Sequence, residues 1–257
     1  MQSSQADKAD AFRAMHVRGD PVILFNIWDP GSARAVAGAG AKALATGSWS
    51  VAAAFGYDDG EQVPFALVLD NLKRIVGAAD LPITADLEMG YGGAPADVGA
   101  SISAALATGV VGFNIEDGLP EGGLRPIAEH SERLRAARGA CAAAGMPAFL
   151  NARIDVFLQN DKSQHASLMK EAATRMDAFA AAGADGLFLP GLVDAALMKL
   201  ACAATPLPVN VMASASTPPI ADLKATGVGR VSYGPGPFRL AMAALETAAR
   251  QAVTTNR

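Results

Sequence analysis

Three acidic residues stand at positions where the strands of a parallel sheet would end. Asp86 and Glu88 are two residues apart in the segment 81–88, so in an extended strand their side chains point the same way, and Glu116 ends the next apolar run. Carboxylates that converge in this way repel one another unless a cation or a shared proton lies between them. Oxygen ligands suit Mg²⁺ or Mn²⁺ better than zinc. The alternative is that these acids cap helices or form ion pairs with arginines.

A second polar group ends the run 147–153, where Asn151 and Arg153 share one side of the expected strand. Arginine presents a planar pair of N–H donors that fits a carboxylate or a phosphonate. An arginine opposite a metal site predicts an anionic substrate, although arginines at strand ends also form structural ion pairs. Asn210 and Tyr233, near the ends of the last two runs, are candidates for substrate binding or for ordinary roles at the rim.

A turn of small residues, TGSWS (46–50), follows the second apolar run. Its backbone N–H groups could hold an oxyanion, and Asp58 and Asp59 come after it in a loop. Turns of this composition are also common in α/β proteins that bind nothing there.

The elements that must position these residues form a repeating pattern. Short apolar runs occupy 21–27, 41–46, 81–88, 110–116, 147–153, 185–191, 207–213 and 229–234, and helical periodicity fills the segments between them, as over 65–76 and 168–179. Glycines expected to end helices precede four of the runs, at Gly40, Gly109, Gly183 and Gly227. The pattern predicts a (β/α)8 TIM barrel, one domain over 1–257 with a short N-terminal helix, whose active site lies at the carboxyl ends of the strands.

Composition argues against several other classes of protein. The chain has 257 residues, 51% of them hydrophobic, and a net charge of −4 with no cluster of Lys and Arg, so neither nucleic acid nor a membrane is an expected partner. No segment has the apolar length of a membrane span or the pattern of a secretory signal, which predicts a cytoplasmic protein. Cys141 and Cys202 are expected to be packed thiols without chemistry. No glycine-rich nucleotide fingerprint follows the first run.

At the acidic and basic residues named above, the sequence resembles the isocitrate lyase and phosphoenolpyruvate mutase superfamily. The motifs TADLEMGYG (84–92), NIEDG (114–118) and NARIDVFL (151–158) occur in the family's order. The resemblance implies that Asp86 is the direct Mg²⁺ ligand and that metal-bound waters are held by Asp59, Glu88 and Glu116. It also implies that Arg153 binds the substrate carboxylate and that amides for the other end of the substrate come from the turn Gly47-Ser48-Trp49.

The segment after the fourth run departs from the family. Lyases of this superfamily carry a gating loop with a K-[KR]-C-G-H motif whose cysteine acts as the acid or base, whereas this chain has EDGLPEGGLRPIAEHSER (116–133). The lysine and asparagine that the mutases and phosphonopyruvate hydrolases use there are also missing. His130, Glu121 and Arg125 are the candidate replacements, with a solvated His130 as the alternative.

Together these observations predict a Mg²⁺-dependent lyase that cleaves a C–C bond in a small 2-oxo or 2-hydroxy (di)carboxylate, with an enolate stabilised by the metal. Two alternatives stay open: P–C bond chemistry, as in a phosphonomutase or phosphonopyruvate hydrolase, and a barrel that binds an oxo acid without turnover. The resemblance also implies a homo-oligomer, a dimer or a tetramer; members of the family commonly exchange a C-terminal helix between neighbours, and the sequence leaves open whether this chain does so.

Overall fold

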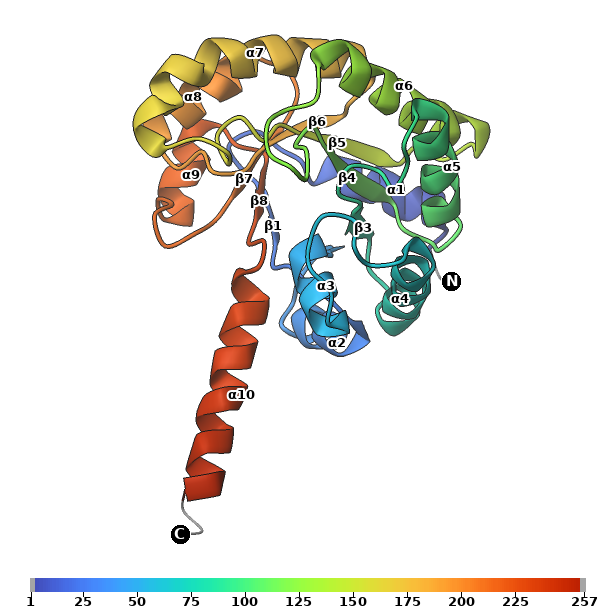
Figure 1. Cartoon of the computed structure of the whole chain (residues 1–257), viewed down its shortest axis with the longest axis vertical. Coiled ribbons are helices and arrows are strands. Elements are labelled where there is room, and N and C mark those ends of the chain that lie inside the picture. The colour runs from blue at the N-terminus through green and yellow to red at the C-terminus, as the bar shows by residue number, and fades with distance from the viewer. Residues whose placement is uncertain (1–2, 255–257) are drawn as a thin grey trace.

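The eight apolar runs form eight parallel strands of one barrel, which confirms the predicted (β/α)8 fold (Figure 1). The computed structural model describes residues 3–254. The strands are β1 (Val22–Leu24), β2 (Leu44–Ala45), β3 (Ile83–Asp86), β4 (Gly112–Glu116), β5 (Phe149–Arg153), β6 (Gly186–Leu189), β7 (Val209–Met212) and β8 (Arg230–Ser232). They pair in the order β1-β8-β7-β6-β5-β4-β3-β2. A parallel bridge between Ile27 and Thr46 joins the two end strands and closes the barrel.

Ten helices lie within residues 3–254, and most of them surround the barrel on its outer side (Figure 1). They are α1 (Gln5–Ala14), α2 (Pro30–Gly38), α3 (Ser48–Phe55), α4 (Phe65–Ala78), α5 (Pro95–Leu106), α6 (Ile127–Ala143), α7 (His165–Ala181), α8 (Ala195–Ala203), α9 (Ile220–Thr226) and α10 (Gly236–Thr254), with a 3₁₀ turn at Lys162–Gln164. α10 differs from the others because it extends away from the barrel (Figure 1). Within residues 3–254, no helix has the length and apolar character needed to cross a lipid bilayer.

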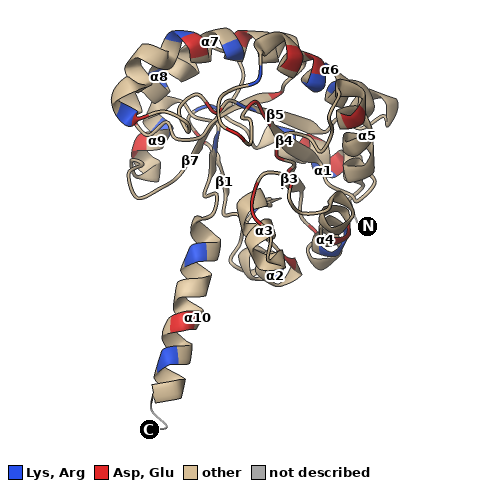
Figure 2. Ribbon diagram, in the orientation of Figure 1, with Lys and Arg blue, Asp and Glu red and all other residues tan. Residues whose placement is uncertain are grey.

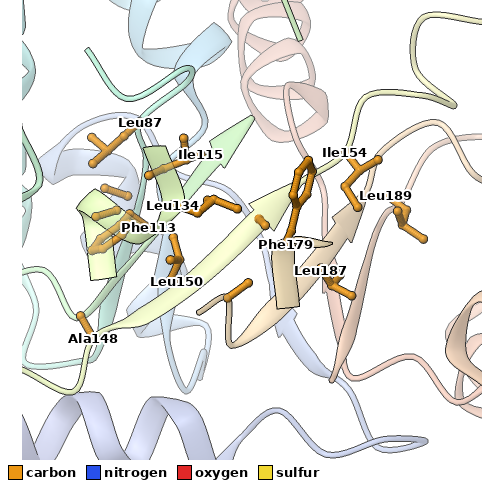
Figure 3. Close-up of a cluster of buried hydrophobic side chains, with 14 of the residues drawn as sticks. Leu87, Phe113, Ile115, Leu134, Ala148, Leu150, Ile154, Phe179, Leu187 and Leu189 are labelled. Atoms are coloured by element: carbon orange, nitrogen blue, oxygen red, sulfur yellow. The ribbon is translucent and has the colours of Figure 1, made fainter. Parts of the chain in front are cut away.

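The main core lies between the strands and the helices. Outward-facing residues such as Phe113 on β4 and Leu187 on β6 pack with Leu134 of α6 and Phe179 of α7, and all four are fully buried (Figure 3). Burying both faces of the strands explains why the runs are continuously apolar rather than alternating. The polar residues that remain on the strands therefore face the barrel interior or its mouth.

α1 closes the amino-terminal end of the barrel. The helix begins with a capping box between Ser4 and Asp7, and its Phe12 is fully buried in a cluster with Val22 and Phe149. The predicted N-terminal helix therefore acts as a plug. Apolar side chains therefore fill this end of the barrel.

The four glycines predicted to end helices all have positive φ angles, between 89° and 101°. At Gly109 a second constraint applies, because a Cβ atom there would lie 2.8 Å from Cγ1 of Val76. These glycines shape the turns that return the chain to the sheet.

Candidate active site

A pocket of about 230 Å³ opens at the carboxyl ends of the strands. It is lined by Asn26, Gly47, Ser48, Trp49, Asp59, Asp86, Asn114, Arg153, Leu158, Phe188, Pro190, Met212, Ser232, Gly234 and Pro235. Six of the residues singled out in the sequence lie in this set: Gly47, Ser48, Trp49, Asp59, Asp86 and Arg153. Residues far apart in the chain meet here because parallel strands of a barrel all end at the same mouth.

Asp86 is the last residue of β3 and points into the pocket. Its backbone N–H donates to Oγ1 of Thr46 at 2.9 Å, and its Oδ2 accepts from the backbone N–H of Ser48 at 3.2 Å. Its Oδ1 is buried and accepts no hydrogen bond from the described residues. A buried carboxylate oxygen without a partner is costly unless a ligand or a cation satisfies it.

Glu88 lies just after the sharp turn that ends β3, and it lines a small second cavity together with Asp86. Its φ is +49°, the residue is 3% exposed, and it is not among the residues that line the larger pocket. Oε2 accepts from the backbone N–H groups of Gly60 (2.7 Å) and Glu61 (2.5 Å), and Oε1 accepts from the hydroxyl of Tyr91 (2.7 Å). Glu88 therefore fastens the loop that carries Asp59.

The burial of Glu88 raises its pKa to about 7, and the nearby charges of Asp59 and Asp86 add to the shift. Because the folded-state pKa exceeds the ordinary value of 4.5, the ionised form costs stability as the pH rises from about 4.5 to about 7. Glu88→Gln preserves the shape of the side chain but cannot ionise. In metal-free protein we expect the variant to lose about 3 kcal/mol less of its free energy of unfolding than wild type as the pH rises through this range. Urea unfolding with EDTA at pH 5 and pH 8 would measure it.

The exposed Glu121→Gln is the matched control and should leave the pH dependence unchanged. Equal losses of stability in wild type and Glu88→Gln would show that this carboxylate stays ionised over the whole range.

Arg153 ends β5 and lies between two acids. It forms ion pairs with Glu116 and with Asp155, whose oxygens accept from Nε (2.7 Å) and Nη2 (2.9 Å). Burial raises the pKa of Glu116 well above its ordinary range, while Arg153 lowers it. Asp155 is held in turn, because its backbone N–H donates to Oδ1 of Asp117 at 2.8 Å. The guanidinium is thus fixed in orientation while still facing the pocket.

The turn at 47–49 begins α3, whose N-terminus lies at the pocket. The N–H of Gly47 donates to the carbonyl of Ile27 at 3.2 Å, and that of Ser48 is engaged with Asp86. Among the described residues, the backbone N–H of Trp49 has no hydrogen-bond acceptor, unlike those of Gly47 and Ser48. Asp59 faces this turn, and partial burial together with the charge of Asp86 raises its pKa.

Asn151 and Asn210 lie one layer below the pocket, in the barrel interior. Nδ2 of Asn151 donates to Oδ1 of Asn114 (2.9 Å) and of Asn210 (3.1 Å). Asn114 also accepts from the fully buried Arg230 at 3.3 Å and is the member of this network that lines the pocket. Asn151 and Asn210 therefore do not line the pocket themselves, and they support its floor through Asn114.

Tyr233 lies outside the pocket-lining set, and its ring packs on Phe25 with centroids 5.1 Å apart. Its neighbours Ser232 and Gly234 line the pocket instead. Asn26, which the sequence reasoning missed, accepts from the N–H groups of Tyr233 (2.8 Å) and Gly234 (2.9 Å) and so ties β1 to β8.

His130 does not line the pocket. It is 0% exposed on α6, packs against Phe179 and has no hydrogen bond to the described residues. Burial and nearby arginines lower its pKa to about 3, so it stays neutral. A buried, neutral histidine outside the pocket does not suit the role of the missing acid of the gating loop. The alternative of a solvated His130 is also wrong, because this side of α6 faces the core.

The segment that replaces the gating loop folds on itself. Gly118 and Leu124 form a bridge, and the N–H of Leu119 donates to the carbonyl of Gly123 at 3.0 Å. The candidate Arg125 is paired with Glu129, while Glu121 is exposed. No residue of this hairpin lines the pocket among the described residues.

The residues present fit a divalent cation that has one direct protein ligand. Across residues 3–254, no three Asp, Glu, His or Cys side chains gather closely enough to hold a metal by themselves. The free, buried Oδ1 of Asp86 is the available oxygen. Mg²⁺ commonly takes one or two carboxylates and completes its shell with water and substrate.

A pocket at the mouth of a (β/α)8 barrel that brings two acids and an arginine together with apolar side chains is the arrangement of an enzyme active site. The phosphoenolpyruvate phosphomutase family model matches residues 12–253, and the chain belongs to that family. It is an enzyme of the lyase or phosphonomutase type.

Individual proteins and solved structures are similar to this chain over most of its length. A crystal structure from Burkholderia cenocepacia J2315, provisionally named a phosphonomutase, is 49% identical with a TM-score of 0.94 and covers 97% of this chain and 100% of its own. The 2-methylisocitrate lyase of Escherichia coli is 26% identical over 89% of this chain and 79% of its own length. A phosphonopyruvate hydrolase in complex with oxalate and Mg²⁺ is 22% identical over 97% of this chain and 88% of its own, with a TM-score of 0.84, and shows the fold alone.

Proposed function

We propose that the chain is a Mg²⁺-dependent lyase that cleaves a C–C bond in a small 2-oxo or 2-hydroxy carboxylate. The observation that carries the proposal is the buried, unpartnered Oδ1 of Asp86 in a small pocket that also contains Arg153. The phosphonopyruvate hydrolase solved with oxalate and Mg²⁺ supports the metal and the oxo-acid part of the proposal, since oxalate resembles the enolate of a 2-oxo acid, and it bears equally on P–C bond chemistry. Mg²⁺ bound at Asp86 would act as a Lewis acid on the substrate oxygens.

The chain's own residues supply binding and proton transfer. Arg153, held by Glu116 and Asp155, binds the substrate carboxylate with its remaining N–H groups. The Trp49 amide, at the N-terminus of α3, stabilises negative charge at the other end. We assign Asp59 to metal-bound water, and its raised pKa also suits it to accept a proton in this pocket.

The alternative of P–C bond chemistry is favoured by one observation, the 49% identical structure that is provisionally named a phosphonomutase. Assays with alkyl-substituted malates, oxaloacetate and phosphonopyruvate, each with Mg²⁺ and with EDTA, separate the two. We expect Mg²⁺-dependent release of a 2-oxo acid from a C–C substrate. Turnover of phosphonopyruvate would favour the alternative, and tight Mg²⁺-dependent oxalate binding without any turnover would contradict the enzyme proposal.

We also propose that the enzyme is a homo-oligomer in which α10 packs on a second copy. α10 has 19 residues with Pro237 as its one buried residue, and it carries few charges along its length (Figure 2). Leu240 and Leu245 are 66% and 62% exposed. A groove of about 890 Å³ beside β1 and α2, with Ile23 and Phe25 in its lining, offers an apolar surface for the α10 of a partner.

Leu245→Glu tests this arrangement, because a charge cannot be buried in an apolar interface without a large cost. We expect the variant to elute as a monomer in size-exclusion chromatography with light scattering, whereas Thr247→Glu, about 200° away around the helix, keeps the wild-type mass. A monomeric wild type would contradict the proposal.

A further inference from the structure

Arg230 is a fully buried cation in the barrel interior, and no described carboxylate forms an ion pair with it. Its Cζ lies 5.9 Å from the centroid of the Phe12 ring, and its Nη2 donates to Oδ1 of Asn114 at 3.3 Å. Its Nε and Nη1 have no acceptor among the described residues. Burial lowers the pKa of Arg230 to about 9, and the charge of Asp86 opposes this shift, so the guanidinium is still charged at neutral pH. A buried charge without a counter-ion is costly, which makes packing alone a poor explanation for it.

The hydrogen bonds around Arg230 have a direction that is set by groups able to act in only one way. Nδ2 of Asn210 donates to the backbone carbonyls of Val211 (2.8 Å) and Arg230 (3.3 Å), so its Oδ1 is the atom left to accept. That Oδ1 accepts from Nδ2 of Asn151 at 3.1 Å, and the same Nδ2 donates to Oδ1 of Asn114 at 2.9 Å. A guanidinium can only donate. The oxygen of Asn114 therefore faces Asn151 and Arg230.

The amide nitrogen of Asn114 consequently faces the other way, toward the pocket. Asn114 lines the pocket, and its Nδ2 donates to no acceptor within residues 3–254. This nitrogen is also not among the fully buried polar atoms that lack a partner. Asn114 on β4 pairs in register with Asp86 on β3, and both residues line the pocket. A side-chain N–H donor is thus fixed beside the carboxylate that we assign to Mg²⁺.

A fixed donor in this place suits an oxygen that becomes charged during the reaction. When the C3–C4 bond of a 2-oxo acid with a carboxylate at C4 breaks, C4 leaves as carbon dioxide. The electron pair of the bond forms the C2–C3 double bond, and the electrons of the C2 carbonyl move onto the 2-oxygen, which becomes an enolate. Hydrogen bonds to a charged acceptor are about twice as strong as those to a neutral one. A donor to the 2-oxygen therefore stabilises the enolate more than the keto acid.

We infer that Nδ2 of Asn114 donates a hydrogen bond to the 2-oxygen of the substrate, and that Arg230 fixes and polarises this amide through its oxygen. Asn114 is then a catalytic residue, and Arg230 is a positioning residue that never touches the substrate. The inference rests on the proposed function for the identity of the 2-oxygen. It also gives the buried charge of Arg230 a role, because that charge favours negative charge on the ligand above it.

Oxalate and pyruvate test the donor, because oxalate presents a charged oxygen where pyruvate presents a neutral keto oxygen. In titration calorimetry with saturating Mg²⁺, Asn114→Ala should bind oxalate about 10-fold to 100-fold less tightly than wild type. It should bind pyruvate about threefold to tenfold less tightly, since a hydrogen bond to a neutral acceptor is weaker. The ratio of the two affinities should therefore fall about tenfold. An unchanged ratio would overturn the inference.

Two further variants control this experiment. Asn71→Ala removes an amide that is equally buried, at 6% exposure, but that donates to the carbonyl of Trp28 and does not line the larger pocket. It should leave the affinity ratio unchanged. Asn114→Asp keeps an acceptor toward Arg230 and Asn151 and covers the case in which the alanine variant does not fold. It lacks the donor and should bind oxalate at least about tenfold less tightly. Wild-type affinity in Asn114→Asp would also overturn the inference.

Arg230→Met tests the positioning role, because methionine fills much of the space of the arginine without its charge or its donors. Asn114 then keeps the hydrogen bond from Asn151 but loses the one from Arg230. We expect oxalate to bind about threefold to tenfold less tightly and pyruvate to bind almost as in wild type. Urea unfolding would show whether the variant is folded under these conditions. A folded Arg230→Met with an unchanged affinity ratio would overturn the role of Arg230.

All of these measurements read binding and not turnover. If the affinity ratio falls as expected but wild type cleaves no C–C bond, the proposed function fails and the donor role of Asn114 stands. If wild type cleaves a C–C bond and the ratio does not change in Asn114→Ala, the inference fails and the proposed function stands.

Discussion

Asp86→Asn is expected to abolish Mg²⁺-dependent oxalate binding. The substitution keeps the side-chain shape and the hydrogen bond from Ser48, but it removes the charge of the oxygen that has no other partner. Changes to outer-shell partners of a metal usually cost 10–100-fold in affinity, so loss of the one direct protein ligand should cost more than about 100-fold. Titration calorimetry with oxalate, at several Mg²⁺ concentrations, would measure the change.

Two further variants make this experiment specific. Asp59→Asn should weaken oxalate binding by an intermediate factor, about 10-fold to 100-fold, because we assign Asp59 to metal-bound water. Asp70→Asn, on the exposed face of α4 beside Arg74, should leave affinity unchanged. If Asp86→Asn binds oxalate as the wild type does, the cation lies elsewhere in the molecule.

The barrel was predictable from the sequence because its signals are local and repeated. Each apolar run is short, each is followed by a helical period, and the glycines that end four helices require positive φ angles. β2 is the exception in detail, since the predicted run 41–46 yields a strand of two residues, Leu44–Ala45. Strand ends depend on pairing across the barrel, which no local pattern reports.

The site was predictable where a residue lies on a strand and not where the chain bends. Asp86 and Arg153 end strands, so the two-residue alternation places them at the mouth. Alternation fails for Glu88, because the strand ends at Asp86 and Glu88, Gly90 and Tyr91 all have positive φ. A residue in such a turn does not follow the two-residue alternation of an extended strand.

The sequence pattern also does not predict how deep within the barrel a strand residue lies. Asn151 faces the same way as Arg153 but sits two residues earlier on β5, about 6.6 Å further down the strand. It therefore reaches Asn114 and Asn210 instead of a ligand. His130 illustrates the same difficulty on a helix, since its segment reads as polar while its ring faces the core.

Arg153→Ala is the second variant with a large expected effect, and its effect falls on stability as well as on activity. The guanidinium separates Glu116, whose side chain is 15% exposed, from Asp155, at 4%. Removing one member of a buried ion pair leaves an uncompensated charge, which typically costs 3–5 kcal/mol. We expect a loss of about that size in the free energy of unfolding at pH 7.5, measured with urea, together with a higher KM and a lower kcat.

The pH dependence of this loss identifies its cause. Without Arg153 the pKa of Glu116, already raised by burial, rises further in the folded state. An acid with a raised folded-state pKa stabilises the fold at pH values below its pKa in the unfolded chain and loses that contribution as the pH rises through its folded-state pKa. The loss of stability in Arg153→Ala should therefore be smallest near pH 5.

Arg153→Lys, which keeps the charge but not the planar pair of donors, should recover part of the stability and little of the activity. Arg74→Ala, in an exposed pair, should cost less than about 1 kcal/mol. A deficit in Arg153→Ala that does not change between pH 5 and pH 8 would mean that Glu116 is protonated throughout, and that Asp155 alone holds the arginine toward the substrate.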